Sequence, residues 1–357
     1  MLDSFTCLIH LPFLARIEGA LQRVFDLSYC VRTALAVLPA VAWYLYSGDL
    51  FVLKAALIGV YLLIVSESLR PSGLLLLMHA AVIGISIGLF CLSFAHAWVF
   101  VPLCAGYAAM THGLARWGEG WRSISVFSFI PALYLGCELN AASNLPLAYL
   151  HLLRCYPFAV IPVMLVSLGN LFYERRVRSV EVLRDYCRWR YLLPRQKVTP
   201  EFKRLAIDGA ATRALAVLCA AVVVEQFHLD AGEWLIWSAA SVSTGALAST
   251  GAKHRDRLWG AFVGVSLGVA IAGWVPASAA LYGFAVLGVS VSIATLRNYR
   301  LAFALRCCLC VVCAAALGQG SGIGWLRLSN VVLGGLIGVG AMYMHHLLMR
   351  RWLTHSE

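Results

Sequence analysis

The stretch GAKHRDRLWGAFVGVSLG, residues 251–268, places a basic cluster between two long apolar segments. Lys253, Arg255 and Arg257 carry the charge of this cluster, and Asp256 alone offsets it. Basic clusters that join apolar helices are typical of loops on the cytoplasmic side of membrane proteins. The stretch therefore predicts an inner loop that is followed by a membrane-spanning helix.

The glycines after the cluster form a second pattern. Gly260, Gly264 and Gly268 recur every four residues, which places them on one stripe of a helix. Small residues on such a stripe let a neighbouring helix approach closely. We expect residues 258–274 to form a tightly packed helix, with the basic cluster at its cytoplasmic end as an entrance that attracts anions.

The composition excludes a soluble globular protein. Hydrophobic residues make up 61% of the 357 residues and charged residues only 13%, which is too little polar surface to cover a globule of this size. Apolar runs close to the roughly 20 residues that cross a bilayer occur twelve times, without the strict alternation of barrel strands. They lie near residues 31–47, 50–66, 74–95, 97–114, 123–141, 156–173, 211–228, 234–250, 258–274, 277–295, 301–318 and 329–348. The predicted fold class is an all-α polytopic membrane protein with about twelve transmembrane helices.

Membrane topology explains the net charge of +11. If the N-terminus is cytoplasmic, 25 of the 28 Lys and Arg residues fall in inner loops or at inner helix ends. The positive-inside rule then places both termini in the cytoplasm. The charge needs no nucleic-acid partner, whereas anionic membrane lipid is an expected partner of the basic segment between the two halves.

The two halves of the chain repeat each other. TALAVL at residues 33–38 recurs as RALAVL at residues 213–218, and GISIG later in the first half recurs as GVSLG with the same shift of 180 residues. We interpret this pattern as a tandem duplication whose two six-helix repeats run parallel and share a cavity. The predicted domains are an N-terminal repeat at residues 1–172, a basic cytoplasmic linker at residues 173–210 and a C-terminal repeat at residues 211–357.

Charged residues inside or at the ends of the apolar runs are candidates for a binding site, because a charge in hydrocarbon usually faces a cavity or a partner. Arginines recur at corresponding places in both halves, which predicts a two-sided lining that attracts an organic anion. Snorkelling of these side chains to lipid headgroups is the alternative. The predicted substrate-binding residues are Arg32, Arg122, Arg213, Arg255, Arg257, Arg300, Arg327 and Trp237.

Two residues inside the apolar runs are candidates for proton coupling. His79 and Glu138 could change charge as a transporter alternates between the two sides of the membrane, although a buried packing role is the alternative for each. Cys307, Cys310 and Cys313 share one helix face, but no histidine or carboxylate accompanies them, so they predict core packing. We expect no metal, no cofactor and no catalytic residues.

The chain, most clearly from about residue 210 onward, resembles the fusaric acid resistance family of bacterial inner-membrane proteins, which belongs with the aromatic acid exporters. The segments EWLIWSAASVST, GAKHRDRLWGAFVGVSLG and RLSNVVLGGLIG carry this resemblance. The family pattern is a helix with aromatic and small residues, a basic loop and a Gly-rich helix. The matching positions are Trp234, Trp237, Thr244, Gly245, Lys253, Arg257, Gly260, Gly264 and Gly268.

The resemblance implies a place in the bacterial inner membrane and proton-driven export of small aromatic carboxylates such as hydroxybenzoates, with a periplasmic adaptor protein in some members. The chain departs from the larger exporters by its short cytoplasmic link, where those carry a substantial domain. Two other interpretations stay open, namely a passive organic-anion channel and a non-transporting scaffold of an envelope or secondary-metabolite assembly. An enzyme is not expected.

Overall fold

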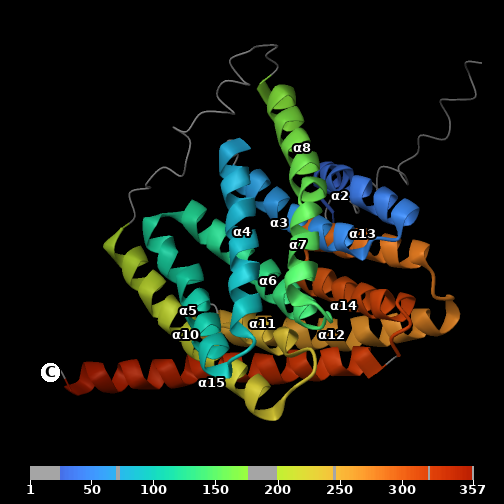
Figure 1. The fold of residues 1–357 in the computed structure, drawn as a ribbon. Helices are drawn as coiled ribbons and strands as arrows, with labels where there is room; N and C mark the ends of the chain where they lie inside the picture. The colour runs from blue at the N-terminus through green and yellow to red at the C-terminus, as the bar shows by residue number, and fades with distance from the viewer. Residues whose placement is uncertain (1–24, 70–72, 176–198, 244–246, 321, 356–357) are drawn as a thin grey trace, which may run out of the picture.

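The computed structural model describes residues 25–69, 73–175, 199–243, 247–320 and 322–355, and helices make up nearly all of this part of the chain (Figure 1). The first half contains α2 (Leu27–Ser47), α3 (Leu50–Leu69), α4 (Gly73–Ser93), α5 (Ala97–Gly113), the 3-10 helix η1 (Leu114–Trp117), α6 (Glu119–Asn140), α7 (Leu145–Arg154) and α8 (Pro157–Arg175). The second half contains α10 (Pro200–Phe227), α11 (Gly232–Val242), α12 (Leu247–Trp274), α13 (Ala279–Ala294), α14 (Tyr299–Ala316) and α15 (Gly322–His355). The all-α prediction is confirmed. Most of the predicted linker, residues 176–198, lies outside the described residues.

The described residues contain ten segments long and apolar enough to cross a membrane, with α7 and α8 together forming one of them. The chain is therefore a multi-pass membrane protein. Each of the twelve predicted runs contains a helix, but α11 has only 11 residues and α13 only 16. At about 1.5 Å per residue both are shorter than the hydrocarbon layer. Twelve full-length spans are therefore not found, and the count among the described residues is ten.

The predicted inner loop in the opening stretch is wrong. Residues 253–257 belong to the continuous helix α12, which begins at Leu247 and runs to Trp274. No proline interrupts this segment, and lysine and arginine are good helix formers, so a local cluster of charge does not end the helix. The basic side chains consequently project from the sides of a helix rather than from a flexible turn.

The two halves contact each other in a reciprocal way. The first described helix of the N-terminal half, α2, packs on α13, and the first described helix of the C-terminal half, α10, packs on α5. Within the halves, α4 packs on α6 and α12 packs on α14. Figure 1 shows α4 and α8 running at a steep angle to α15, which crosses the lower edge of the view. The halves therefore contact each other through both pairs of helices.

The predicted glycine stripe is confirmed as a packing surface. A Cβ atom at Gly264 would collide with the carbonyl oxygen of Ala304, and one at Gly268 would lie 2.7 Å from the carbonyl oxygen of Cys308. A Cβ at Gly260 would lie 3.0 Å from the ring of Phe303. All three contacts are with α14, so α12 lies directly against the backbone of α14. Only glycine allows helices to approach this closely.

We expect Gly264→Ala to lower thermal stability, because the new methyl group would have to displace the backbone of α14. Overpacking of this kind costs about 1–3 kcal/mol. Gly273→Ala is the matched control, since Gly273 lies on the same helix and a Cβ there meets no atom within 4 Å. The measurement is the melting temperature of each purified variant in detergent. Equal melting temperatures for the two variants would contradict the proposed role of the stripe.

Candidate functional site

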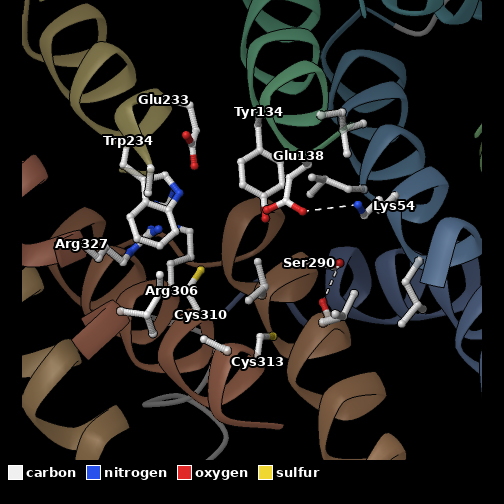
Figure 2. A pocket seen from close by; sticks show the side chains of 18 of the residues that line it. Lys54, Tyr134, Glu138, Glu233, Trp234, Ser290, Arg306, Cys310, Cys313 and Arg327 are labelled. Atoms are coloured by element: carbon white, nitrogen blue, oxygen red, sulfur yellow. Dashed lines mark hydrogen bonds and ion pairs between the residues drawn. The ribbon is translucent and has the colours of Figure 1, made fainter. Parts of the chain in front are cut away.

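A cavity of about 260 Å³ lies between the two halves. Helices α3 and α6 from the first half and α11, α13, α14 and α15 from the second half line it. Its polar and aromatic lining residues include Lys54, Tyr134, Glu138, Glu233, Trp234, Arg306 and Arg327, which Figure 2 labels, and also Tyr61, Trp237 and Tyr282. We call this space the Lys54 cavity. Its volume lies just below the lower end of the range for drug-sized ligands, so it suits a small molecule.

The charged groups of the Lys54 cavity are partly paired. Lys54 Nζ lies 3.3 Å from a carboxylate oxygen of Glu138, and Figure 2 shows this pair facing the open space. The guanidinium of Arg327 lies 4.6 Å from the ring centre of Trp234, and its Nε has no hydrogen-bond partner. Arg327 is only 7% exposed, so its charge is held inside the protein by an aromatic face rather than by a carboxylate.

A tight turn places Trp234 and Glu233 at the cavity. Residues 228–231 join α10 to α11, and the side chain of Asn330 on α15 donates to the carbonyl oxygens of Asp230 and Ala231, both at 3.1 Å. A Cβ atom at Gly232 would collide with the side chain of Val224 on α10, so a larger residue where the chain enters α11 would displace that side chain. The contacts fix the start of α11, and with it the two side chains that follow.

A second cavity, of about 590 Å³, adjoins the basic part of α12. We call it the Arg257 cavity. The polar and aromatic residues that line it are Tyr29, Tyr61, Glu67, Ser68, Phe127, Trp237, Ser241, Lys253, Arg257, Tyr299 and Arg306. It too is lined by residues from both halves.

Arg257 is buried in the wall of this cavity, with 5% of its surface exposed. Its two terminal nitrogens donate to Tyr299 Oη at 3.2 Å and to Ser238 Oγ at 3.1 Å. Its guanidinium lies 4.3 Å from the ring centre of Phe303. Ser238 in turn donates to the carbonyl oxygen of Val331 at 3.0 Å. Arg257 thus joins α12 to α11 and α14, and through Ser238 to α15.

The two cavities meet at four shared lining residues, Tyr61, Trp237, Ile293 and Arg306. Tyr61 comes from the first half and the other three from the second half. Tyr61, Trp237 and Arg306 therefore border both cavities. Among the described residues, this group marks the boundary between two spaces that could hold a small ligand.

Four of the predicted site residues line the cavities. Arg257 and Arg327 supply charge, Trp237 belongs to the shared group, and Glu138 is paired with Lys54. These residues lie far apart in the sequence, and the packing of the halves brings them to one connected region.

The other predicted arginines lie outside the cavity linings. Arg32 makes a two-pronged ion pair with Glu67, at 2.7 and 2.9 Å, and thereby holds a carboxylate that borders the Arg257 cavity. Arg213 is buried between α10 and α5, where it donates to Thr111 Oγ1 at 3.0 Å. Arg300 is exposed and pairs with Asp256 at 2.6 Å. The contacts of these three arginines join helices to one another.

The remaining predicted residues are also away from the cavities. Arg122 and Arg255 are exposed, and neither lines a cavity. His79 is 1% exposed and belongs to α4, outside both linings, and neither of its ring nitrogens has a hydrogen-bond partner. A residue that couples protons to transport has to reach the space that the substrate occupies. Glu138 lines the Lys54 cavity and meets this condition, whereas His79 lines neither cavity.

The sequence reasoning missed Arg306, Lys54, Glu233 and Tyr61 as site residues. Arg306 and Lys54 each stand inside a predicted apolar run, and a charge inside such a run is itself a signal of a cavity or a partner. The positive-inside rule counts both residues only as charges that set topology. Nothing in the local pattern distinguishes Tyr61 from other aromatic residues in the spans.

One group of side chains in the described part of the chain has the composition of a metal site. Single ligand atoms of Asp49, His151 and Cys155 lie within 4.8 Å of one another. Asp49 accepts hydrogen bonds from Phe51 N at 2.9 Å and pairs with His151 Nε2 at 3.0 Å. These bonds satisfy the carboxylate, so the group is explained as a hydrogen-bonded cluster that ties α7 to the turn between α2 and α3.

The predicted thiol row on α14 contains no disulfide. Cys307 is buried against α12, whereas Cys310 and Cys313 border the Lys54 cavity. The core-packing prediction therefore describes Cys307, and the other two thiols are part of the cavity wall.

Comparison with known proteins gives one match. Residues 216–341 match the family described as "Fusaric acid resistance protein-like". The matched segment runs from α10 into α15 and includes α11, α12, α13 and α14. No curated protein and no solved structure matches the chain. The predicted resemblance is confirmed: over residues 216–341, this membrane protein matches the fusaric acid resistance protein-like family.

Proposed function

We propose that the protein is a secondary transporter that exports small organic anions, with aromatic carboxylic acids as substrates and the proton gradient as the driving force. The observation that carries the proposal is the pair of cavities between the halves, which meet at Tyr61, Trp237 and Arg306. Cations attract the carboxylate group, and tyrosine and tryptophan rings offer surfaces for an aromatic ring. The family match agrees with a membrane transporter.

We infer that the two halves form a parallel tandem repeat, and the reciprocal packing of α2 on α13 and of α10 on α5 supports this. Two threonines near the ends of α5 and α13 support it as well. Thr111 contacts Arg213 on α10 at 3.0 Å, and Thr295 contacts Cys30 on α2 at 3.7 Å. In a repeat with a shared cavity, the two halves can rock against each other and expose the site to alternate sides.

The proposed orientation places both termini in the cytoplasm of a bacterial inner membrane, as the distribution of lysine and arginine favours. In this orientation Lys253 and Arg257 mark the cytoplasmic side, and the turn containing Asp49 marks the outer side. The Arg257 cavity would then receive anions from the cytoplasm, and the Lys54 cavity would release them. Membrane lipid and a periplasmic adaptor protein remain proposed partners.

The first test is transport by the purified protein in liposomes. We expect uptake or release of a radiolabelled hydroxybenzoate, and we expect the rate to fall when a protonophore collapses an imposed proton gradient. Vesicles without protein are the control. Flux that persists unchanged without the gradient would favour the channel, and no flux with any member of a panel of aromatic acids would favour the scaffold.

We expect Arg257→Lys to reach the membrane normally but to transport poorly. Lysine keeps the charge, but it cannot bridge Tyr299 and Ser238 while it stacks on Phe303. Loss of one charged hydrogen bond costs about 1.5–3 kcal/mol, enough for roughly a tenfold effect. Arg204→Lys, at an exposed position on α10, is the control. Transport by Arg257→Lys at the wild-type rate, at equal membrane abundance, would make Arg257 a topology signal only.

We expect Glu138→Gln to retain transport down a substrate gradient but to lose stimulation by the proton gradient. The amide imitates a permanently protonated carboxyl group and breaks the charge balance with Lys54. Glu201→Gln, at an exposed position on α10, is the matched control. The measurement is the transport rate with and without an imposed pH difference. If both variants respond like the wild type, Glu138 does not couple protons to transport.

A further inference from the structure

We infer that Arg306, together with Tyr61 and Trp237, forms the carboxylate-binding position through which a substrate passes from the Arg257 cavity to the Lys54 cavity. This inference rests on the proposed transport function and names the residues that would bind the substrate. The expected ligand is a small acid that carries one carboxylate on an aromatic ring.

The position of Arg306 supports this inference. Among the described residues, it is the single charged residue that lines both cavities. It lies on α14, which packs against the glycine stripe of α12. A guanidinium at the junction of two cavities is reached from both of them, so an anion can meet it before and after a change of conformation.

The guanidinium of Arg306 also keeps free donors. Its Nε donates to the carbonyl oxygen of Ala302, at 3.1 Å, which directs the side chain along its own helix. Neither terminal nitrogen forms an ion pair with a described acid, whereas Arg32 is paired with Glu67 and Arg300 with Asp256. The two terminal nitrogens carry four N–H groups in a planar fork, the geometry that suits a carboxylate.

The charge balance around Arg306 favours an anion. The Arg257 cavity contains three cationic side chains and one acid, Glu67, which Arg32 already neutralises. The Lys54 cavity contains three cations and two acids, one of which is paired with Lys54. Both spaces therefore hold a surplus of positive charge. Burial of such a surplus is costly unless an anion joins it.

Aromatic side chains lie beside Arg306. Tyr61 and Trp237 share the same boundary, one from each half. The ring of Phe303 lies beneath the cations, 4.3 Å from the guanidinium carbon of Arg257 and 5.7 Å from that of Arg306. This cation–π contact holds both guanidiniums near one ring. A ligand with a carboxylate and a ring can therefore contact the fork of Arg306 and the faces of Tyr61 and Trp237 together.

The test uses the purified full chain in proteoliposomes, with radiolabelled 4-hydroxybenzoate as the probe. We expect Arg306→Gln to reduce transport at least about tenfold, and Arg306→Lys to keep part of it, because lysine retains the charge but not the fork. Arg116→Gln removes the same charge from an exposed position outside both cavities, and we expect it to transport like the wild type. All rates are compared at equal protein abundance in the vesicles.

A selectivity measurement separates ligand binding from a structural role. In the wild type, benzoate should inhibit transport of the probe much more strongly than the neutral analogue benzamide. Arg306→Gln should lose most of this difference in its remaining transport, and Trp237→Leu should weaken inhibition by benzoate relative to acetate. Loss of stability alone would lower the rate without changing the order of the inhibitors.

The results distinguish a failure of this binding position from a failure of the proposed function. If the wild type transports the probe and Arg306→Gln keeps both its rate and its preference for benzoate, the inference is wrong and the proposed function stands. If the wild type moves no aromatic acid, the proposed function fails and the binding position fails with it. If Arg306→Gln does not assemble, Arg306→Lys decides: a raised KM with normal stability supports the inference, and an unchanged KM overturns it.

Discussion

The close contact between α12 and α14 is the constraint on which the candidate site depends. Because Gly260, Gly264 and Gly268 have no side chains, the two helices meet backbone to backbone. This contact brings Arg257 on α12 over the ring of Phe303 on α14, one turn before Arg306. A larger side chain on the stripe would separate the helices and move both guanidiniums. The close packing of small residues therefore determines where the guanidinium groups of Arg257 and Arg306 lie inside an apolar protein.

The arginines of the protein differ in the groups that balance their charge. This difference distinguishes arginines that join helices from an arginine that can bind a ligand. Arg32 and Arg300 face carboxylates, and Arg213 donates to a threonine between two helices. Arg327 and Arg257 lie on aromatic rings. Within the part of the chain that the structure describes, Arg306 alone combines free terminal donors with a place at the junction of the two cavities. In a medium of low dielectric constant, an arginine without an acid partner is the group most able to attract an anion.

The contacts between halves add a second requirement. Neither cavity is complete within one half, because Tyr61, Lys54 and Glu138 come from the first half, whereas Trp237 and Arg306 come from the second. The crossed packing of α2 on α13 and of α10 on α5 keeps the halves in register. Any motion of one half relative to the other would therefore change the space around Arg306 directly. The packing between the halves therefore determines whether a ligand can reach Arg306.

The sequence by itself determined the helical class, the membrane setting, the positions of most helices and the family resemblance, because apolar composition and length are local properties. It also predicted the glycine stripe, since a four-residue period is visible in the chain. It could not determine that residues 253–257 continue a helix, nor that α11 and α13 are short. Only the tertiary structure decided which charges meet partners, because the acids that neutralise Arg32 and Arg300 lie 35 and 44 residues away along the chain. The role inferred for Arg306 depends on that distribution of partners and on two cavities built by helices from both halves.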